Sequence, residues 1–170
     1  MKPKLIIFDL DDTLLDTTGI LIPIARTPAF EERIRQPLPL LPGALENLQI
    51  LSKKYDLVLL TQGRTDAQKL KVSSLGISPF FKDQFFADPI RNENKTHWFL
   101  KIRDRWNISS HEMLSIGNRL TTDIREAKKM GAQTCLFKYG EHQNEVMELP
   151  EDRPDFEVDN HQDLIRICHL

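Results

Sequence analysis

The chain has 170 residues, 40% of them hydrophobic and 28% charged, which fits a single globular domain. Its formal net charge is -2 with both signs interspersed, so we expect neither a nucleic-acid nor an anionic-membrane partner. The apolar runs are far too short to cross a bilayer, and residues 1–8 lack the pattern of a signal peptide. Cys135 and Cys168 are isolated, so they predict no disulfide framework and favour a cytoplasmic location.

Short apolar runs alternate with amphipathic segments along the chain. Runs of this length and continuous apolar character are typical of parallel strands covered on both faces. We expect strands at residues 4–8, 56–61, 83–87, 112–116 and 133–137, and a short edge strand at 156–158.

The segments between these runs predict helices. The first expected helix opens at Pro42-Gly43 with Leu45, Leu48 and Leu51 inward, and the second begins with a Thr65/Gln68 capping box. The third carries Phe99, Ile102 and Trp106 on one face. The fourth is capped by Thr121 or Thr122 and ends at Gly131, and the last contains Leu164 and Ile165. Alternating strands and helices predict an α/β, three-layer Rossmann-like domain over residues 1–170, with helices on both faces of a parallel sheet.

Asp9, Asp11 and Asp12 form a dense acidic cluster directly after the first expected strand. Burying carboxylates there is costly unless a cation or hydrogen-bond donors compensate them. An acidic turn is the alternative interpretation, because Asp is common in turns. Ligands of open parallel sheets bind at the carboxyl ends of strands, near the point where strand order reverses. We therefore expect Asp9, Thr61 and Asn118, each at or after a strand end, to converge.

The segment Phe8-Asp9-Leu10-Asp11-Asp12-Thr13-Leu14 matches the motif DxDxT. In this motif the chain resembles phosphatases of the haloacid dehalogenase (HAD) superfamily, and the resemblance covers roughly residues 4–137. It implies that Asp9 attacks phosphorus to form an aspartyl-phosphate, that Asp11 is the general acid and base, and that Mg²⁺ is the cofactor. Residues two apart in an extended segment point to the same side, so both carboxyls can face one substrate.

Two further motifs of the family have matches at Thr61 and Lys95. The resemblance implies that the Thr61 hydroxyl, with backbone N–H groups around Gln62 and Gly63, holds phosphate oxygens. Arg64 is either a substrate-binding cation or a solvated residue near a helix start, and we favour the second interpretation slightly. Lys95 is expected to pair with the nucleophile and the transferring phosphoryl group, although Thr96 follows it where many relatives have Pro.

The fourth motif, GDxxxxD, is matched by residues 117–123 with Asn118 in place of the first acid. An amide oxygen can bind Mg²⁺ but adds no negative charge. The resemblance implies a metal site made of Asp9, the backbone carbonyl of Asp11, Asn118 and water, with Asp123 holding a metal-bound water or orienting Lys95. We expect weaker magnesium affinity or a preference for another divalent ion, and loss of activity is the alternative.

Residues 16–42 form the only insertion of note, with room for a helix around 28–35 but not for a full cap domain. An open site implies a phosphorylated small molecule or a bulky phosphorylated substrate, or a partner subunit over the site. The apolar residues of the insertion predict packing on the domain or a homo-oligomer interface. A catalytically weak domain that binds a phosphorylated ligand or protein is the alternative function. Phosphoryl transfer to another acceptor and dehalogenation are disfavoured.

Overall fold

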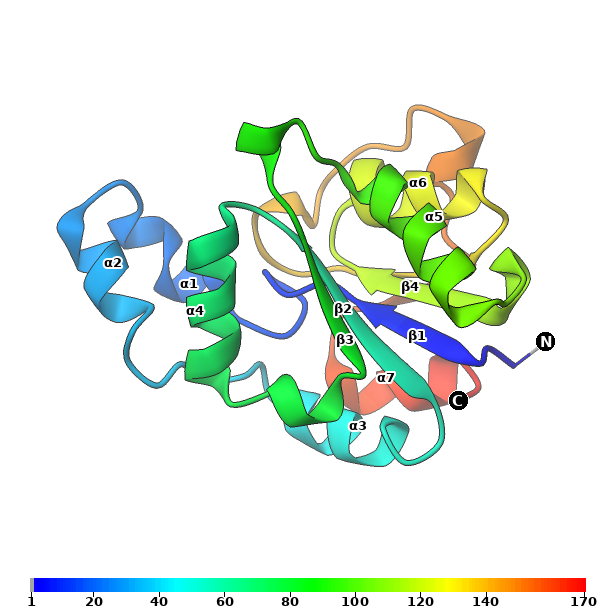
Figure 1. Cartoon of the computed structure of the whole chain (residues 1–170), viewed down its shortest axis with the longest axis horizontal. Helices are drawn as coiled ribbons and strands as arrows, with labels where there is room; N and C mark the ends of the chain where they lie inside the picture. The colour runs from blue at the N-terminus through cyan, green and yellow to red at the C-terminus, as the bar shows by residue number, and fades with distance from the viewer. Residues whose placement is uncertain (1) are drawn as a thin grey trace.

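A parallel sheet organises the computed structural model, which describes residues 2–170 (Figure 1). Its strands are β1 (Leu5–Phe8), β2 (Asp56–Gln62), β3 (Asp83–Ala87), β4 (Met113–Gly117), β5 (Gln133–Phe137) and β6 (Phe156–Val158), in the order β3-β2-β1-β4-β5-β6. All neighbouring strands are parallel. The chain runs from β1 to one edge and then returns to the other side of β1, so the strand order reverses there. This confirms the predicted α/β class.

The register aligns the carboxyl ends of the three central strands. Phe8 pairs with Leu59 of β2 and with Ile116 of β4. The Asp9 N–H then donates to the Ile116 carbonyl at 2.9 Å. The residues that follow these strands therefore emerge at one edge of the sheet, as predicted.

Helices cover both faces of the sheet (Figure 1). The helices α3 (Ala44–Leu51), α4 (Thr65–Leu75) and α7 (His161–Ile167) pack on one face, and α5 (Lys95–Trp106) and α6 (Arg125–Lys129) pack on the other. Within β1, Ile6 and Phe8 belong to the first core and Leu5 and Ile7 to the second. Because successive side chains of a strand point to opposite faces, a strand covered on both sides must be apolar throughout.

The short helices α1 (Thr17–Ile20) and α2 (Pro28–Arg33) lie in the expected insertion, beside α4 (Figure 1). Leu15, Leu21, Ile34 and Leu38 form a separate apolar cluster with Ala67 of α4. The buried apolar residues of the insertion therefore pack on its own domain, and the homo-oligomer stays a prediction. None of the helices in residues 2–170 is long and apolar enough to span a membrane. Cys135 and Cys168 are buried and unpaired.

Three local predictions were wrong. Thr65 does not cap α4, because both its N–H and its hydroxyl donate to Asp88 at 3.0 Å. The N-cap position is Arg64, whose side chain makes no capping bond. Leu45 is 42% exposed, whereas Asn47 is buried on the inner side of α3 and donates to the His161 carbonyl at 2.7 Å.

The third error concerns the start of α6, which no Thr side chain caps. A π-helical turn, Leu120–Ile124, precedes it. In this turn the Asp123 carboxylate accepts the Arg119 N–H at 3.1 Å, and the Asp123 carbonyl accepts the Ser115 hydroxyl at 2.9 Å. These bonds draw Asp123 inward, and the regular helix begins only after it.

Asp12 joins the loops that follow β1 and β5. Its carboxylate accepts the N–H and the hydroxyl of Thr18 at 2.8 and 2.7 Å, and the Thr18 hydroxyl accepts the Glu141 N–H at 2.9 Å. Gly140 lies so close that a Cβ there would be 2.2 Å from an Asp12 carboxylate oxygen. The close approach of the two loops requires glycine at this position.

Replacing Gly140 by alanine should destabilise the fold more than replacing Gly76. Both glycines have positive φ, +72° and +67°, but a Cβ on Gly76 would meet nothing within 4 Å. Gly76→Ala should therefore cost only the backbone strain, about 1–2 kcal/mol. Gly140→Ala should cost at least about 1 kcal/mol more, because the Asp12 carboxylate must move. Urea denaturation measures both, and equal losses would contradict the steric account.

Candidate active site

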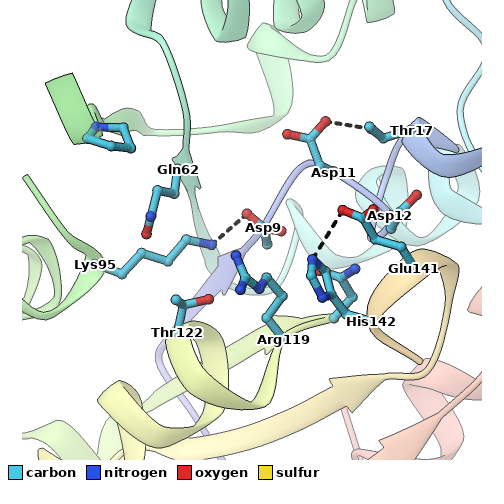
Figure 2. Close-up of a pocket in the computed structure, with 12 residues that line it drawn as sticks. Asp9, Asp11, Asp12, Thr17, Gln62, Lys95, Arg119, Thr122, Glu141 and His142 are labelled. Carbon is cyan, nitrogen blue, oxygen red and sulfur yellow. Dashed lines mark hydrogen bonds and ion pairs between the residues drawn. The ribbon is translucent and has the colours of Figure 1, made fainter. Parts of the chain in front are cut away.

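A pocket of about 230 Å³ opens at the carboxyl ends of the central strands (Figure 2). It is lined by Asp9, Asp11, Asp12, Thr17, Gln62, Pro89, Lys95, Asn118, Arg119, Thr122, Glu141 and His142. These residues come from the last position of β2 and from the segments after β1, β3, β4 and β5. The pocket therefore lies where the strand order reverses, as the fold class predicts.

Lys95 joins two buried carboxylates at the base of the pocket. Its ammonium group lies 2.6 Å from Asp9 and 2.5 Å from Asp123, and the Lys95 side chain is only 3% exposed. Lys95 is the first residue of α5, where Asn94 caps the helix by accepting the His97 N–H. The cap fixes the start of the helix and so directs the lysine into the pocket (Figure 2).

Burial raises the pKa of Asp9 to about 7, with Asp123 and Asp11 adding to the rise and Lys95 opposing it. Burial opposes the charge of Lys95 as well, but the attraction of Asp123 and Asp9 raises its pKa above the ordinary value. One cation thus faces two buried carboxylates. Burial, reinforced by the negative charges of Asp123 and Asp11, is the reason that Asp9 holds a proton more readily than an exposed aspartate.

Asp11 lies in the same pocket but in a different electrostatic environment. Its carboxylate accepts bonds from Lys71 and Gln68 at 2.7 Å and from the Thr17 hydroxyl at 2.5 Å. Burial favours the neutral form, but the charge of Lys71 and these hydrogen bonds together lower the pKa of Asp11. Asp11 is therefore held as a carboxylate.

Gln68 and Lys71 were not predicted as site residues, and Gln68 was predicted to cap α4. Both are buried on the inner side of α4, at 2% and 6% exposure. Gln68 also donates to the Thr61 hydroxyl at 2.6 Å. Two polar residues three positions apart on a helix face that otherwise packs inward were the available signal.

The segment after β2 contributes less than predicted. Thr61 is fully buried beneath Gln68, and only Gln62 of this segment lines the pocket. The Gly63 N–H donates to the Ala87 carbonyl at 3.0 Å, so it is not free for a phosphate oxygen. Arg64 was predicted as a substrate-binding candidate, but it forms ion pairs with Glu31 and Asp66 and does not line the pocket. The solvated alternative describes Arg64 better.

The predicted metal-binding residues are divided between the pocket and its base. Asp9, Asp11 and Asn118 line the pocket, and the Asn118 amide N–H points to the Tyr139 carbonyl at 3.4 Å. That bond leaves the Asn118 amide oxygen available. With the Asp9 carboxylate and the predicted Asp11 backbone carbonyl, it would form a donor set of the type Mg²⁺ prefers. Asp123 lies behind Lys95 with both oxygens bonded, which favours its role in orienting Lys95.

No cluster of three or more His, Cys, Asp or Glu side chains arranged to hold a metal occurs within residues 2–170. The donor set described above includes an amide and a backbone carbonyl, which are not groups of that kind.

His161, from α7, fixes the backbone of the loop between Asp9 and α1. Its Nε2 lies 2.7 Å from the Thr13 carbonyl, and burial lowers the pKa of this histidine. The neutral ring thus donates to the loop between Asp9 and α1.

The far wall of the pocket contains residues that were not predicted as site residues. Arg119 and Thr122 follow β4, and Glu141 and His142 follow β5. No helix or strand was predicted between residues 138 and 155. The available signal was that β5 ends at the same edge of the sheet as β1 and β4, so the residues after it had to lie near Asp9.

Comparison with known proteins agrees with this geometry. A family model described as HAD-hydrolase-like matches residues 94–164. Glyceraldehyde 3-phosphate phosphatase of Pyrococcus abyssi is 29% identical over 197 residues, and the match covers 81% of this chain and 82% of the relative. The enzyme of the same name from Pyrococcus furiosus is 26% identical over 208 residues, and the match covers 87% of this chain and 86% of that relative. The magnesium-bound structure of the HAD-hydrolase YfnB from Bacillus subtilis superposes with a TM-score of 0.75 at 20% identity, covering 100% of both chains.

The chain is therefore similar in sequence and in fold to haloacid dehalogenase-like hydrolases. The two Pyrococcus relatives are phosphatases, in agreement with the class that the motifs of this chain predicted.

The protonation of Asp9 can be measured directly. In metal-free protein with ¹³C-labelled aspartate, we expect one carboxyl to titrate with a pKa of about 7. Lys95→Met should raise this pKa further because a neighbouring positive charge is lost, and Asp123→Asn should lower it because a negative charge is lost. The ionised fraction of Asp9 should therefore increase as the pH rises through neutrality. A wild-type value near the ordinary 3.8 would contradict the account of the site.

Proposed function

We propose that this protein is a magnesium-dependent phosphomonoester hydrolase that acts through an aspartyl-phosphate on Asp9. The observation that carries the proposal is the contact of Lys95 with both Asp9 and Asp123 beneath a pocket that also contains Asp11. A carboxylate is a weak nucleophile, and it reaches an anionic phosphoryl group only where positive charge neutralises that group. Lys95 is placed beside the attacking oxygen for this purpose.

The reaction has two balanced steps. In the first, an Asp9 oxygen forms a bond to phosphorus while the ester P–O bond breaks, and Asp11, which must take up a proton before this step, gives that proton to the departing alkoxide. In the second, Asp11 takes a proton from water, whose oxygen attacks phosphorus and releases inorganic phosphate and the Asp9 carboxylate. Lys71, Gln68 and Thr17 stabilise the ionised form of Asp11, which suits its role as the base of the second step.

Asp9, the backbone carbonyl of Asp11 and Asn118 would hold the magnesium ion. When bound, the ion neutralises charge on the phosphoryl oxygens. Because Asn118 is neutral, the affinity for the ion should be lower than in a site with a carboxylate at this position.

The substrate is proposed to be a small phosphorylated molecule. Glyceraldehyde 3-phosphate phosphatases are relatives of this chain, and a pocket of about 230 Å³ suits a phosphorylated compound of similar size. The alignment with the Pyrococcus abyssi enzyme runs over 197 positions although the chain has 170 residues, so that relative has inserted residues absent from this chain. We propose a single domain over residues 1–170 whose short segment 16–42 does not form a full cap.

Asp9→Asn should abolish hydrolysis of p-nitrophenyl phosphate in the presence of Mg²⁺, lowering kcat about a thousandfold or more. This substrate suits the test because its leaving group needs little protonation by Asp11. Asp104→Asn is the matched control, since its carboxylate is 66% exposed on α5, and it should keep wild-type activity. If the wild type gives no more product than Asp9→Asn with any of several divalent metals, the weak, ligand-binding alternative replaces the phosphatase.

Asn118→Asp should bind Mg²⁺ about tenfold more tightly, a gain of about 1.4 kcal/mol, because a carboxylate adds negative charge to the donor set. Calorimetric titration of the protein with MgCl₂ measures the affinity without relying on turnover. Asn144→Asp, which adds the same charge outside the pocket lining, is the control and should change the affinity little. Unchanged affinity in Asn118→Asp would place Asn118 outside the metal site.

A further inference from the structure

Arg119 has a guanidinium N–H, that of Nε, for which residues 2–170 provide no hydrogen-bond acceptor. Its Nε is buried without a hydrogen-bond partner, and the Glu145 oxygen of its ion pair lies 3.6 Å away. The side chain is 40% exposed and lines the pocket. Lys95 also lines the pocket, but it is bonded to Asp9 and Asp123. The Arg119 guanidinium therefore offers donors to a bound molecule.

Glu145 holds Arg119 in this orientation. One Glu145 oxygen accepts the Leu120 N–H at 2.7 Å, and the other lies 3.1 Å from Nδ1 of His142 as well as 3.6 Å from Nε of Arg119. Glu145 thus connects the loop after β4 to the turn after β5. Arg119 and His142 share one carboxylate and lie on the same wall of the pocket.

In the proposed reaction this wall would face the leaving group. Figure 2 shows Lys95 approaching Asp9 from one side, with Arg119 directed toward Asp9 from another and Asp11 across the pocket from Arg119. In an in-line displacement the leaving group lies on the side of phosphorus opposite the nucleophile, toward the pocket mouth. A substituent of the leaving group near Asp11 then lies within the space that Arg119 lines.

We infer that Arg119, oriented by Glu145 and flanked by His142, binds an anionic group on the leaving-group side of the substrate. This rests on the proposed phosphatase function and names its substrate class, short phosphorylated hydroxy acids. A guanidinium binds a carboxylate with two parallel hydrogen bonds, which a neutral hydroxyl cannot reproduce. The Glu141 carboxylate also lines the pocket, but it lies 3.3 Å from Nε2 of His142 and is 52% exposed.

The test compares two compounds that differ chiefly in a carboxylate, 3-phosphoglycerate and glycerol 3-phosphate. Calorimetry on Asp9→Asn protein, with Mg²⁺ present, measures their Kd values without turnover. We expect 3-phosphoglycerate to bind at least about tenfold more tightly, since charged hydrogen bonds are the stronger ones. Adding Arg119→Met should weaken the binding of 3-phosphoglycerate about 10- to 100-fold and the binding of glycerol 3-phosphate less than about threefold. Arg119→Lys should retain part of the preference.

Controls separate this role from others. Arg103→Met removes an arginine of similar exposure, 37%, from outside the pocket and should change neither Kd. Glu145→Gln should reduce the preference for 3-phosphoglycerate in part, because Arg119 loses the group that orients it. If Arg119→Met weakened the binding of both compounds equally, Arg119 would be assigned to the phosphoryl group and the inference would be overturned. Unchanged binding of 3-phosphoglycerate in both Arg119 variants would also overturn it.

Failure of the inference and failure of the phosphatase proposal remain distinguishable. Turnover of p-nitrophenyl phosphate, lost in Asp9→Asn, tests the hydrolysis alone, because this compound has no carboxylate. Wild-type turnover together with equal affinity for the two three-carbon compounds would overturn only the substrate class. Carboxylate preference in a protein without turnover would support the subsite and overturn the phosphatase.

Discussion

The contact of one buried ammonium group with two buried carboxylates is the interaction on which the site depends. Lys95 compensates Asp9 and Asp123, which are both buried, and removing one member of a buried ionic group costs about 3–5 kcal/mol. Burial, together with an excess of one negative charge in this group, raises the pKa of Asp9 to about 7. The same excess makes the pocket favourable for a cation and keeps the nucleophile beside the lysine that would neutralise its target.

The fold holds this group by assembling segments from four loops at one sheet edge. Asp123 reaches Lys95 only because the turn after β4 is π-helical and bonded to Ser115 and Arg119. Asp12 and Gly140 bring the loops after β1 and β5 together. His161, at the start of α7, donates to the Thr13 carbonyl and fixes its position. Each contact restricts a loop whose backbone has little regular structure, so the charged side chains have few alternative positions.

Two adjacent residues after β4 change the charge of this site relative to the motif that it resembles. Asn118 is neutral where an acid is expected, and Arg119 adds a cation directed into the pocket. Both differences make the wall after β4 less negative. A less negative wall holds a divalent cation less tightly and accepts an anionic substrate more readily. The proposed weak metal affinity and the proposed acidic substrate class therefore have the same electrostatic origin.

The sequence by itself determined the strands, their parallel arrangement and the resemblance to a family, because two-sided burial demands continuous apolar runs and because the acidic motif has a distinctive spacing. It also indicated Asp9, Asp11, Lys95 and Asn118 as pocket residues, since each follows a strand or opens a helix. Only the tertiary structure decided which polar residues of α4 and its cap support the site. Gln68 and Lys71 donate to Asp11, and Arg64 pairs with Glu31 instead, because the rotation of α4 and its packing against α2 set where each side chain points. Such orientations depend on contacts between segments far apart in the chain, which local sequence patterns do not encode.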